Sequence, residues 1–326
     1  MPLRSRIALF LAAFVVLLTT SSCAPKTTTA KPTTMPTRTT AWLQVLIDDT
    51  SDPQIRVRPS AAAQDAVFGP LLRRGEREAA AAIGNVLVGQ SSLAAFEKSE
   101  MVTIAARHLH PLDAVIVFAG VPGSIAPESM VDERGAPLWR KVDARVRGTD
   151  EYARLHRTED GTTEIDPRMR LVVIGGSTWV MALGPATERM FSALAIGTPD
   201  ALHPDAGPLA EVVAVGELLE AFKRGKRFPD LEAALSTLER ADLTLVGGKA
   251  PDAKLVLSFQ TAEGAAHGED LGTTLLRITK EKWPKHRAIL DGITVGRVDR
   301  KVTIDAPVPR LVVEMLEDAE KPATAL

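Results

Sequence analysis

Two histidines and an aspartate form a pattern that can ligate a metal ion. His108 and His110 are two residues apart, which places both imidazoles on one side of an extended segment, and Asp113 follows nearby. Two imidazoles and one carboxylate can hold zinc or iron. These residues flank Pro111 at a connection between two predicted strands, so a solvated loop is the competing interpretation. We keep the three residues as candidate ligands and expect no cofactor.

Motifs of the common hydrolases and nucleotide-binding proteins do not occur in this sequence. The segment 120–124 follows an apolar strand, as phosphate-binding loops do, but it lacks the lysine and the glycine spacing of a P-loop. Neither G-x-S-x-G nor S-x-x-K is found. The acidic cluster of Asp48, Asp49 and Asp52 lacks the glycine and the closing glutamate of a calcium loop, so it predicts a turn. We therefore expect a protein that is not an enzyme.

The composition excludes several classes of protein. The 326 residues include 39 basic and 41 acidic side chains, and a net charge of −2 provides no basic field for nucleic acid. With 45% hydrophobic and 25% charged residues, the chain has the composition of a globular protein. A single cysteine rules out a disulfide framework and any zinc site built from several cysteines.

The N-terminus has the three parts of a signal peptide. Arg4 and Arg6 precede twelve consecutive apolar residues, 7–18, and small polar residues follow. An apolar segment of this length is shorter than the roughly 20 residues that a membrane-spanning helix needs. We expect residues 1–22 to be a signal peptide that is removed.

The only cysteine, Cys23, comes directly after this signal, with Ser21 and Ser22 before it. This arrangement resembles the lipobox of bacterial lipoprotein precursors, with Thr20 at the position where that family prefers leucine. The resemblance implies that the Cys23 sulfur carries a diacylglyceryl group, that cleavage occurs before Cys23, and that the new N-terminus is acylated, with chains such as palmitate. Alanine at position 24 then implies the outer membrane of a Gram-negative cell, facing the periplasm or the cell surface.

Residues 23–40 are expected to be a lipidated linker. Residues 24–40 contain eight threonines, three prolines and three basic residues but no acid, so they cannot bury a core. As an extended spacer, the segment reaches up to about 50 Å at roughly 3.1 Å per residue.

The body alternates between strand and helix patterns. Residues 42–47 and 54–58 predict a hairpin, residues 101–106 and 114–119 predict two strands, and residues 171–183, interrupted by two glycines, predict a hairpin. Further strands are expected at 152–157, 243–246, 254–259, 293–298 and 301–305. Helices are expected at 60–68, 76–83, 92–98, 127–131, 187–194, 217–223, 230–240, 262–283 and 309–316.

These elements predict an α+β fold with a largely antiparallel sheet, because the connections between its strands are short. We expect two pseudo-repeats of ββα type, with the helices packed on one face of the sheet. The halves span residues 41–200 and 201–326, either as separate domains or as one. The order resembles that of uncharacterised predicted lipoproteins of Gram-negative bacteria.

Three glycines recur every four residues in the longest predicted helix. Gly264, Gly268 and Gly272 form one flat stripe. Each costs about 1 kcal/mol relative to alanine, so a close contact between helix and sheet is expected, with a looser segment or a binding surface as alternatives.

The leading functional hypothesis is a membrane-tethered envelope lipoprotein that acts as a non-catalytic binding or structural component of a protein assembly. The alternatives are a carrier or sensor of a small apolar ligand or lipid, and a hydrolase with an unrecognised site. A deep apolar pocket above about 300 Å³ favours the carrier, whereas a closed core favours the protein partner.

Overall fold

A computed structural model describes most of the body of the chain. The described residues are 41–47, 53–66, 68–69, 95–109, 112–132, 134–158, 160–216, 219, 235–248, 251–282, 284 and 287–307. The signal peptide, the linker and Cys23 lie outside them, as do His110 and the helices predicted at 76–83, 217–223 and 309–316, except Leu219.

The chain divides into two compact units, which we call the first and the second unit. The first comprises residues 34–61 and 76–207, and the second comprises residues 1–33, 62–75 and 208–326. The chain passes from one to the other within α3 (Pro59–Gln64). Within each unit, the paired strands of the described chain are all antiparallel, so the predicted α+β class with an antiparallel sheet is confirmed.

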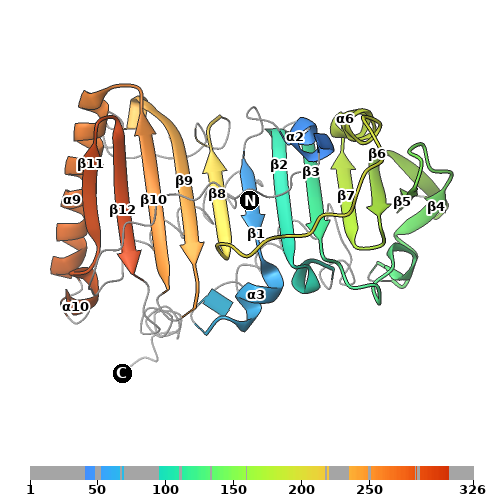
Figure 1. Cartoon of the computed structure of the whole chain (residues 1–326), viewed down its shortest axis with the longest axis horizontal. Helices are drawn as coiled ribbons and strands as arrows, with labels where there is room; N and C mark the ends of the chain where they lie inside the picture. The colour runs from blue at the N-terminus through green and yellow to red at the C-terminus, as the bar shows by residue number, and fades with distance from the viewer. Residues whose placement is uncertain are drawn as a thin grey trace. The chain divides into compact units, whose positions relative to one another are not determined.

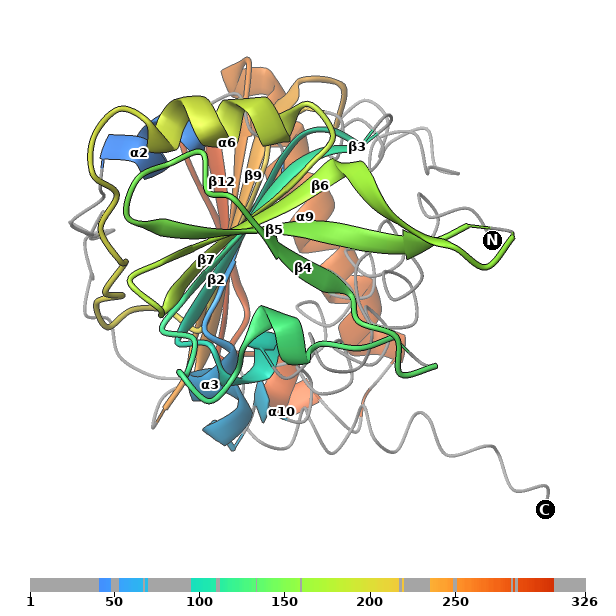
Figure 2. The same ribbon diagram turned by 90° about the vertical axis from the view of Figure 1, so that its right-hand side faces the viewer.

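The strands of the first unit are hydrogen-bonded in the order β1-β2-β3-β7-β6-β5-β4 (Figure 1). Their bounds are β1 Gln54–Val57, β2 Met101–Leu109, β3 Leu112–Ala119, β4 Trp139–Val142, β5 Thr149–Arg157, β6 Thr163–Ile174 and β7 Thr178–Leu183. The helices are α2 (Ala41–Leu46), the 3-10 turn η1 (Pro127–Ser129) and α6 (Ala186–Leu194). Figure 2 shows α2 and α6 together on one side of these strands.

The central strands of the first unit are buried on both faces. Alternate residues of β3, such as Val115 and Val117, join α2 and α6 in one core. The residues between them, such as Ile116 and Phe118, form a second core with Trp139 of β4 on the opposite face. A strand that packs on both sides needs apolar residues at every position, which explains the unbroken apolar sequences of β3 and β7.

The predicted hairpin within residues 171–183 is confirmed. It is formed by β6 and β7, which pair from Met169 opposite Leu183 to Ile174 opposite Thr178. Gly175 and Gly176 occupy the turn with φ of 56° and 72°, a conformation that favours glycine. Within the described part of the chain, no helix combines the length and the hydropathy needed to cross a membrane.

The strands of the second unit are hydrogen-bonded in the order β11-β12-β10-β9-β8. Their bounds are β8 Ala210–Ala214, β9 Leu238–Val246, β10 Asp252–Phe259, β11 Thr294–Val298 and β12 Lys301–Pro307. The long helix α9 (Ala262–Lys282) packs on β10, β11 and β12, and the short α10 (Arg287–Leu290) follows it (Figure 1). Phe259 and Val302 are buried in the core of this unit together with Ala265 of α9.

Two predicted elements are wrong. Residues 41–46 form the helix α2 rather than one strand of a hairpin, and β1 pairs with β2 instead. Trp42, Leu43 and Leu46 are buried while Val45 is half-exposed, which is the burial pattern of a helix. The sequence does not reveal this pattern, because nearly every residue of this short segment is apolar. A helix is predicted to continue to Arg240, but residues 238–240 belong to the strand β9, which begins at Leu238.

Candidate functional site

Of the three candidate metal ligands, the described residues include two. His108 lies opposite Asp113 in the β2–β3 hairpin. Both carboxylate oxygens of Asp113 accept hydrogen bonds from Nη1 of Arg189 on α6, at 2.8 and 2.7 Å. In the described part of the chain, no group of three or more His, Cys, Asp or Glu side chains is placed to hold a metal ion. The position of Asp113 therefore links β3 to α6 through an ion pair.

A second buried carboxylate, Glu151 on β5, also has a structural setting. Its side chain is 3% exposed and accepts hydrogen bonds from the backbone N–H of Arg145 at 3.1 Å and from its Nη2 at 3.2 Å. Nε of Arg170 lies 3.7 Å from the same carboxylate. The Arg145 guanidinium in turn lies 3.4 Å from the ring centroid of Phe191 on α6. These contacts hold the loop before β5 against α6.

The phenol of Tyr152 is buried on the opposite face of the same sheet. The pKa of Tyr152 lies far above its usual value, chiefly because the phenol is buried and to a smaller extent because it forms a hydrogen bond with Glu128. The hydroxyl therefore stays protonated at neutral pH and acts as a hydrogen-bond donor rather than as a base.

The glycine stripe of α9 lies against the strands of the second unit. A Cβ at Gly268 would lie 2.5 Å from Cζ of Phe259, and one at Gly272 would lie 3.2 Å from Cγ1 of Val295. A Cβ at Gly264 would overlap the hydroxyl of Thr237. The stripe thus lets the helix approach β10 and β11 more closely than side chains would permit.

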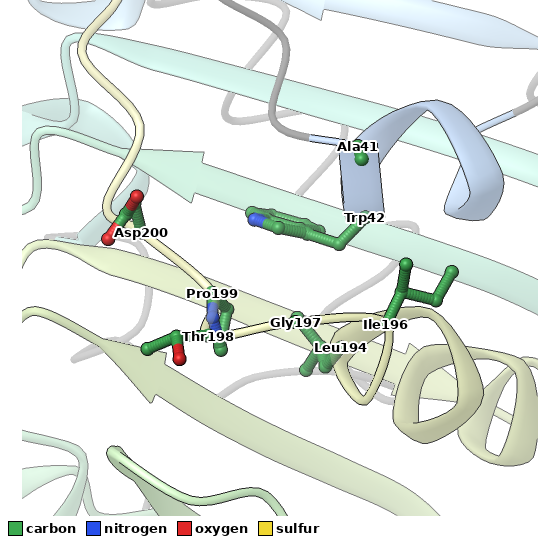
Figure 3. A pocket seen from close by; sticks show the side chains of 8 residues that line it. All are labelled: Ala41, Trp42, Leu194, Ile196, Gly197, Thr198, Pro199 and Asp200. Carbon is green, nitrogen blue, oxygen red and sulfur yellow. The ribbon is translucent and has the colours of Figure 1, made fainter.

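A shallow pocket of about 210 Å³ lies where α2 meets the end of α6 in the first unit (Figure 3). It is lined by Ala41, Trp42, Leu194, Ile196, Gly197, Thr198, Pro199 and Asp200. The indole of Trp42 forms one side, the segment after α6 forms the other, and Asp200 stands at the end toward which the indole nitrogen points (Figure 3). Trp42, Leu194 and Pro199 are buried, so the pocket has an apolar floor.

Local sequence explains how the segment after α6 comes to line this pocket. Gly197 and Pro199 follow the helix closely, and neither residue type continues a helix well. Further along, the backbone N–H of Leu202 donates to the buried hydroxyl of Thr178 on β7 at 2.7 Å. This hydrogen bond fixes the segment after α6 to β7.

Exposed apolar side chains lie at the pocket and along α2. Ala41 and Ile196, which line the pocket, are exposed, Ile196 by 58%. Val45 follows Ala41 by one helical turn and is 50% exposed. We call these three residues together with the pocket the α2–α6 patch. Surfaces on which large apolar side chains gather beside a pocket are typical of binding sites.

Sequence reasoning did not find the α2–α6 patch. Its residues come from positions 41–45 and 194–200, and only the packing of α2 on α6 brings them together. A helical interpretation of residues 41–46 would have placed Ala41 and Val45 on one exposed face.

Comparisons of the chain with family models, curated proteins and solved structures found no match.

Proposed function

We propose that this protein is a lipoprotein of the cell envelope that acts as a non-catalytic binding or structural component of a protein assembly. Cys23 and its acyl chains hold it in the outer membrane, and residues 24–40 are the tether. The body faces the periplasm or the cell surface. The proposal rests on the lipobox-like sequence at Cys23 for the tether, and on the α2–α6 patch for the binding role.

The observation that carries the binding role is the exposure of Ile196 at a small pocket and of Val45 one helical turn after Ala41, which also lines it. A volume of about 210 Å³ lies below the roughly 300 Å³ at which pockets for whole small molecules begin. A partner protein that contributes one side chain fits this surface better than a carried lipid does, because a lipid needs its whole apolar length buried.

Replacement of the cysteine tests the tether. We expect Cys23→Ser to move the protein from the membrane fraction to the soluble periplasm, or to leave it uncut on its signal peptide. Two or more acyl chains anchor stably, at roughly 0.8 kcal/mol per buried methylene, and the variant has none. Ser22→Ala is the matched control, since it keeps a small residue beside an intact cysteine. A cleaved serine variant that resists a high-salt wash of the membrane would contradict the lipid anchor.

Purification of the native lipidated protein in a mild detergent tests the assembly. We expect a defined protein to co-purify at a fixed ratio and to survive a second purification step. A protein that elutes alone, at the size expected for one chain in a micelle, would contradict the proposed role.

We also propose that the two units derive from one ββα pseudo-repeat with its helix on one sheet face. In support, β6, β7 and α6 form a hairpin followed by a helix, and β9, β10 and α9 do the same. Superposition of the two hairpins is the test. The repeat predicts that α6 and α9 then lie on the same face, and helices on opposite faces would contradict it.

A further inference from the structure

The α2–α6 patch combines an apolar floor with one carboxylate that has no bonded partner. Among the described residues, no hydrogen bond or ion pair engages Asp200, which is exposed at the end of the pocket (Figure 3). Two buried carboxylates of the first unit, Asp113 and Glu151, differ from it in that arginine binds both. Asp200 is therefore free to meet a positive charge from outside.

We propose that the α2–α6 patch binds a partner protein through one apolar side chain that is flanked by lysine or arginine. The apolar side chain enters the pocket between Trp42 and Pro199, and the basic side chain pairs with Asp200. This inference rests on the proposed binding role and names the chemistry of the partner.

The size of the pocket sets the size of the apolar group. An apolar cavity of roughly 150 Å³ holds a benzene molecule, so about 210 Å³ has room for a single leucine, methionine or phenylalanine side chain. Ile196, which lines the pocket, then covers one side of that residue and excludes water from its contact with the floor.

The charge around the patch favours a peptide over a membrane surface. Among the described residues that line the pocket, Asp200 is the only charged one, and it is exposed. An anionic lipid head group would be repelled by this carboxylate, whereas a basic side chain of a peptide would be attracted.

Three fluorescein-labelled peptides test the inference against the full-length lipidated protein in a non-ionic detergent. Their sequences are Gly-Lys-Leu-Lys-Gly, Gly-Glu-Leu-Glu-Gly and Gly-Lys-Ser-Lys-Gly, and fluorescence polarisation measures their affinities. We expect the Lys-Leu peptide to bind about tenfold more tightly than the Glu-Leu peptide, because one close charge pair changes sign. The serine peptide should bind roughly fivefold more weakly than the leucine peptide, since it leaves the pocket unfilled.

Variants of the patch complete the test. Asp200→Lys should reverse the order of the Lys-Leu and Glu-Leu peptides, and Ile196→Ser should weaken both. Glu164→Lys and Val131→Ser are the matched controls, because both residues are exposed in the first unit and neither lies on α2, on α6 or in the pocket. All four variants change exposed side chains, and thermal melting followed by circular dichroism checks their folding. Equal affinities for the three peptides, or an unchanged order in Asp200→Lys, would overturn the inference.

Two further outcomes separate this inference from the proposals that precede it. If Asp200→Lys still co-purifies with the same native partner as the unchanged protein, the docking inference fails and the assembly role stands. If Ile196→Ser weakens binding of the unlipidated Cys23→Ser protein to phosphatidylglycerol vesicles and leaves the peptide affinities unchanged, the patch contacts lipid and the inference is overturned.

Discussion

The two units use their sheets differently. In the first unit, every residue of β7 is buried, because α2 and α6 cover one face and the layer around Trp139 covers the other. In the second unit, β10 alternates: Ala253, Leu255 and Phe259 are buried, whereas Lys254 between them is exposed. The register places Lys254, Asp305 and Asp242 on the same face of that sheet.

The two units also differ in how deeply the carboxylates of their ion pairs are buried. Two ion pairs of the first unit have buried carboxylates, since Asp113 and Glu151 are 6% and 3% exposed in their pairs with arginine, whereas Lys141 and Asp150 form an exposed pair. The second unit spreads its pairs over the polar face, where Lys254 contacts Asp305 and Arg240 contacts Asp242. Substitutions of matched type should therefore cost more in the first unit.

The largest expected effect is that of Glu151→Ala. The substitution leaves the guanidinium groups of Arg145 and Arg170 without their shared carboxylate, and it also removes the acceptor of the Arg145 backbone N–H. Loss of one partner of a buried pair costs about 3 kcal/mol or more. The free energy of unfolding, from urea titration followed by circular dichroism, measures this cost.

The matched substitution in the second unit is Asp242→Ala. It breaks the ion pair with Arg240, whose side chain is 49% exposed, so we expect a cost of about 0–1 kcal/mol. A cost equal to that of Glu151→Ala would mean that the two faces do not differ in the way their burial suggests.

The next largest effect is expected for Gly268→Leu. Its side chain would enter the space of the Phe259 ring and push α9 away from β10, and overpacking of this kind costs roughly 1–3 kcal/mol. Gly296→Ala on β11 is the control, because a Cβ there meets no heavy atom within 4 Å. We expect Gly296→Ala to melt at nearly the same temperature as the unchanged protein, and Gly268→Leu to melt at a lower temperature. Equal melting temperatures for both variants would mean that the glycine stripe does not set the distance between helix and sheet.

Much of the fold could be predicted because the pattern of apolar residues in several segments is typical of a strand or of a helix. The buried strands β3 and β7 are continuous apolar runs, and the long α9 starts at the predicted residue and extends to Lys282. The strands β4 and β8 were missed because they are short and mix apolar with polar residues. Periodicity needs more residues than such strands provide.

The contacts that define the candidate site were beyond sequence reasoning. Arg189 binds Asp113 across 76 positions of sequence, so no spacing rule relates the two residues. The α2–α6 patch likewise depends on which face of α2 meets α6. By contrast, the recurrence of Gly264, Gly268 and Gly272 within one helix is a local pattern, and local patterns can be interpreted before the fold is known.

The smallest expected effects concern two aspartates whose pKa values shift in opposite directions. Asp166 in the first unit has a pKa below the usual 3.8, chiefly because the side chain of Arg168 donates hydrogen bonds to it. Asp252 in the second unit has a raised pKa, because burial disfavours its charged form and Asp305 lies nearby. Titration of the carboxyl carbons by NMR should give values on opposite sides of 3.8, and two values on the same side would contradict the comparison.

These directions predict opposite effects of Asp→Asn on melting temperature. Asp166 stabilises the fold above its unfolded pKa, and this contribution is lost as the pH falls through the lowered value, so Asp166→Asn should melt earlier at pH 7 and converge with the unchanged protein in acid. The ionised Asp252 opposes folding above its raised pKa, and protonation removes that penalty. Asp252→Asn should therefore melt later at pH 7 and lose its advantage as the pH falls. Both shifts should be about 1–2 °C, because the two groups are partly solvated. If Asp252→Asn melts earlier at pH 7, then Lys254 stabilises the Asp252 carboxylate more than burial and Asp305 oppose it.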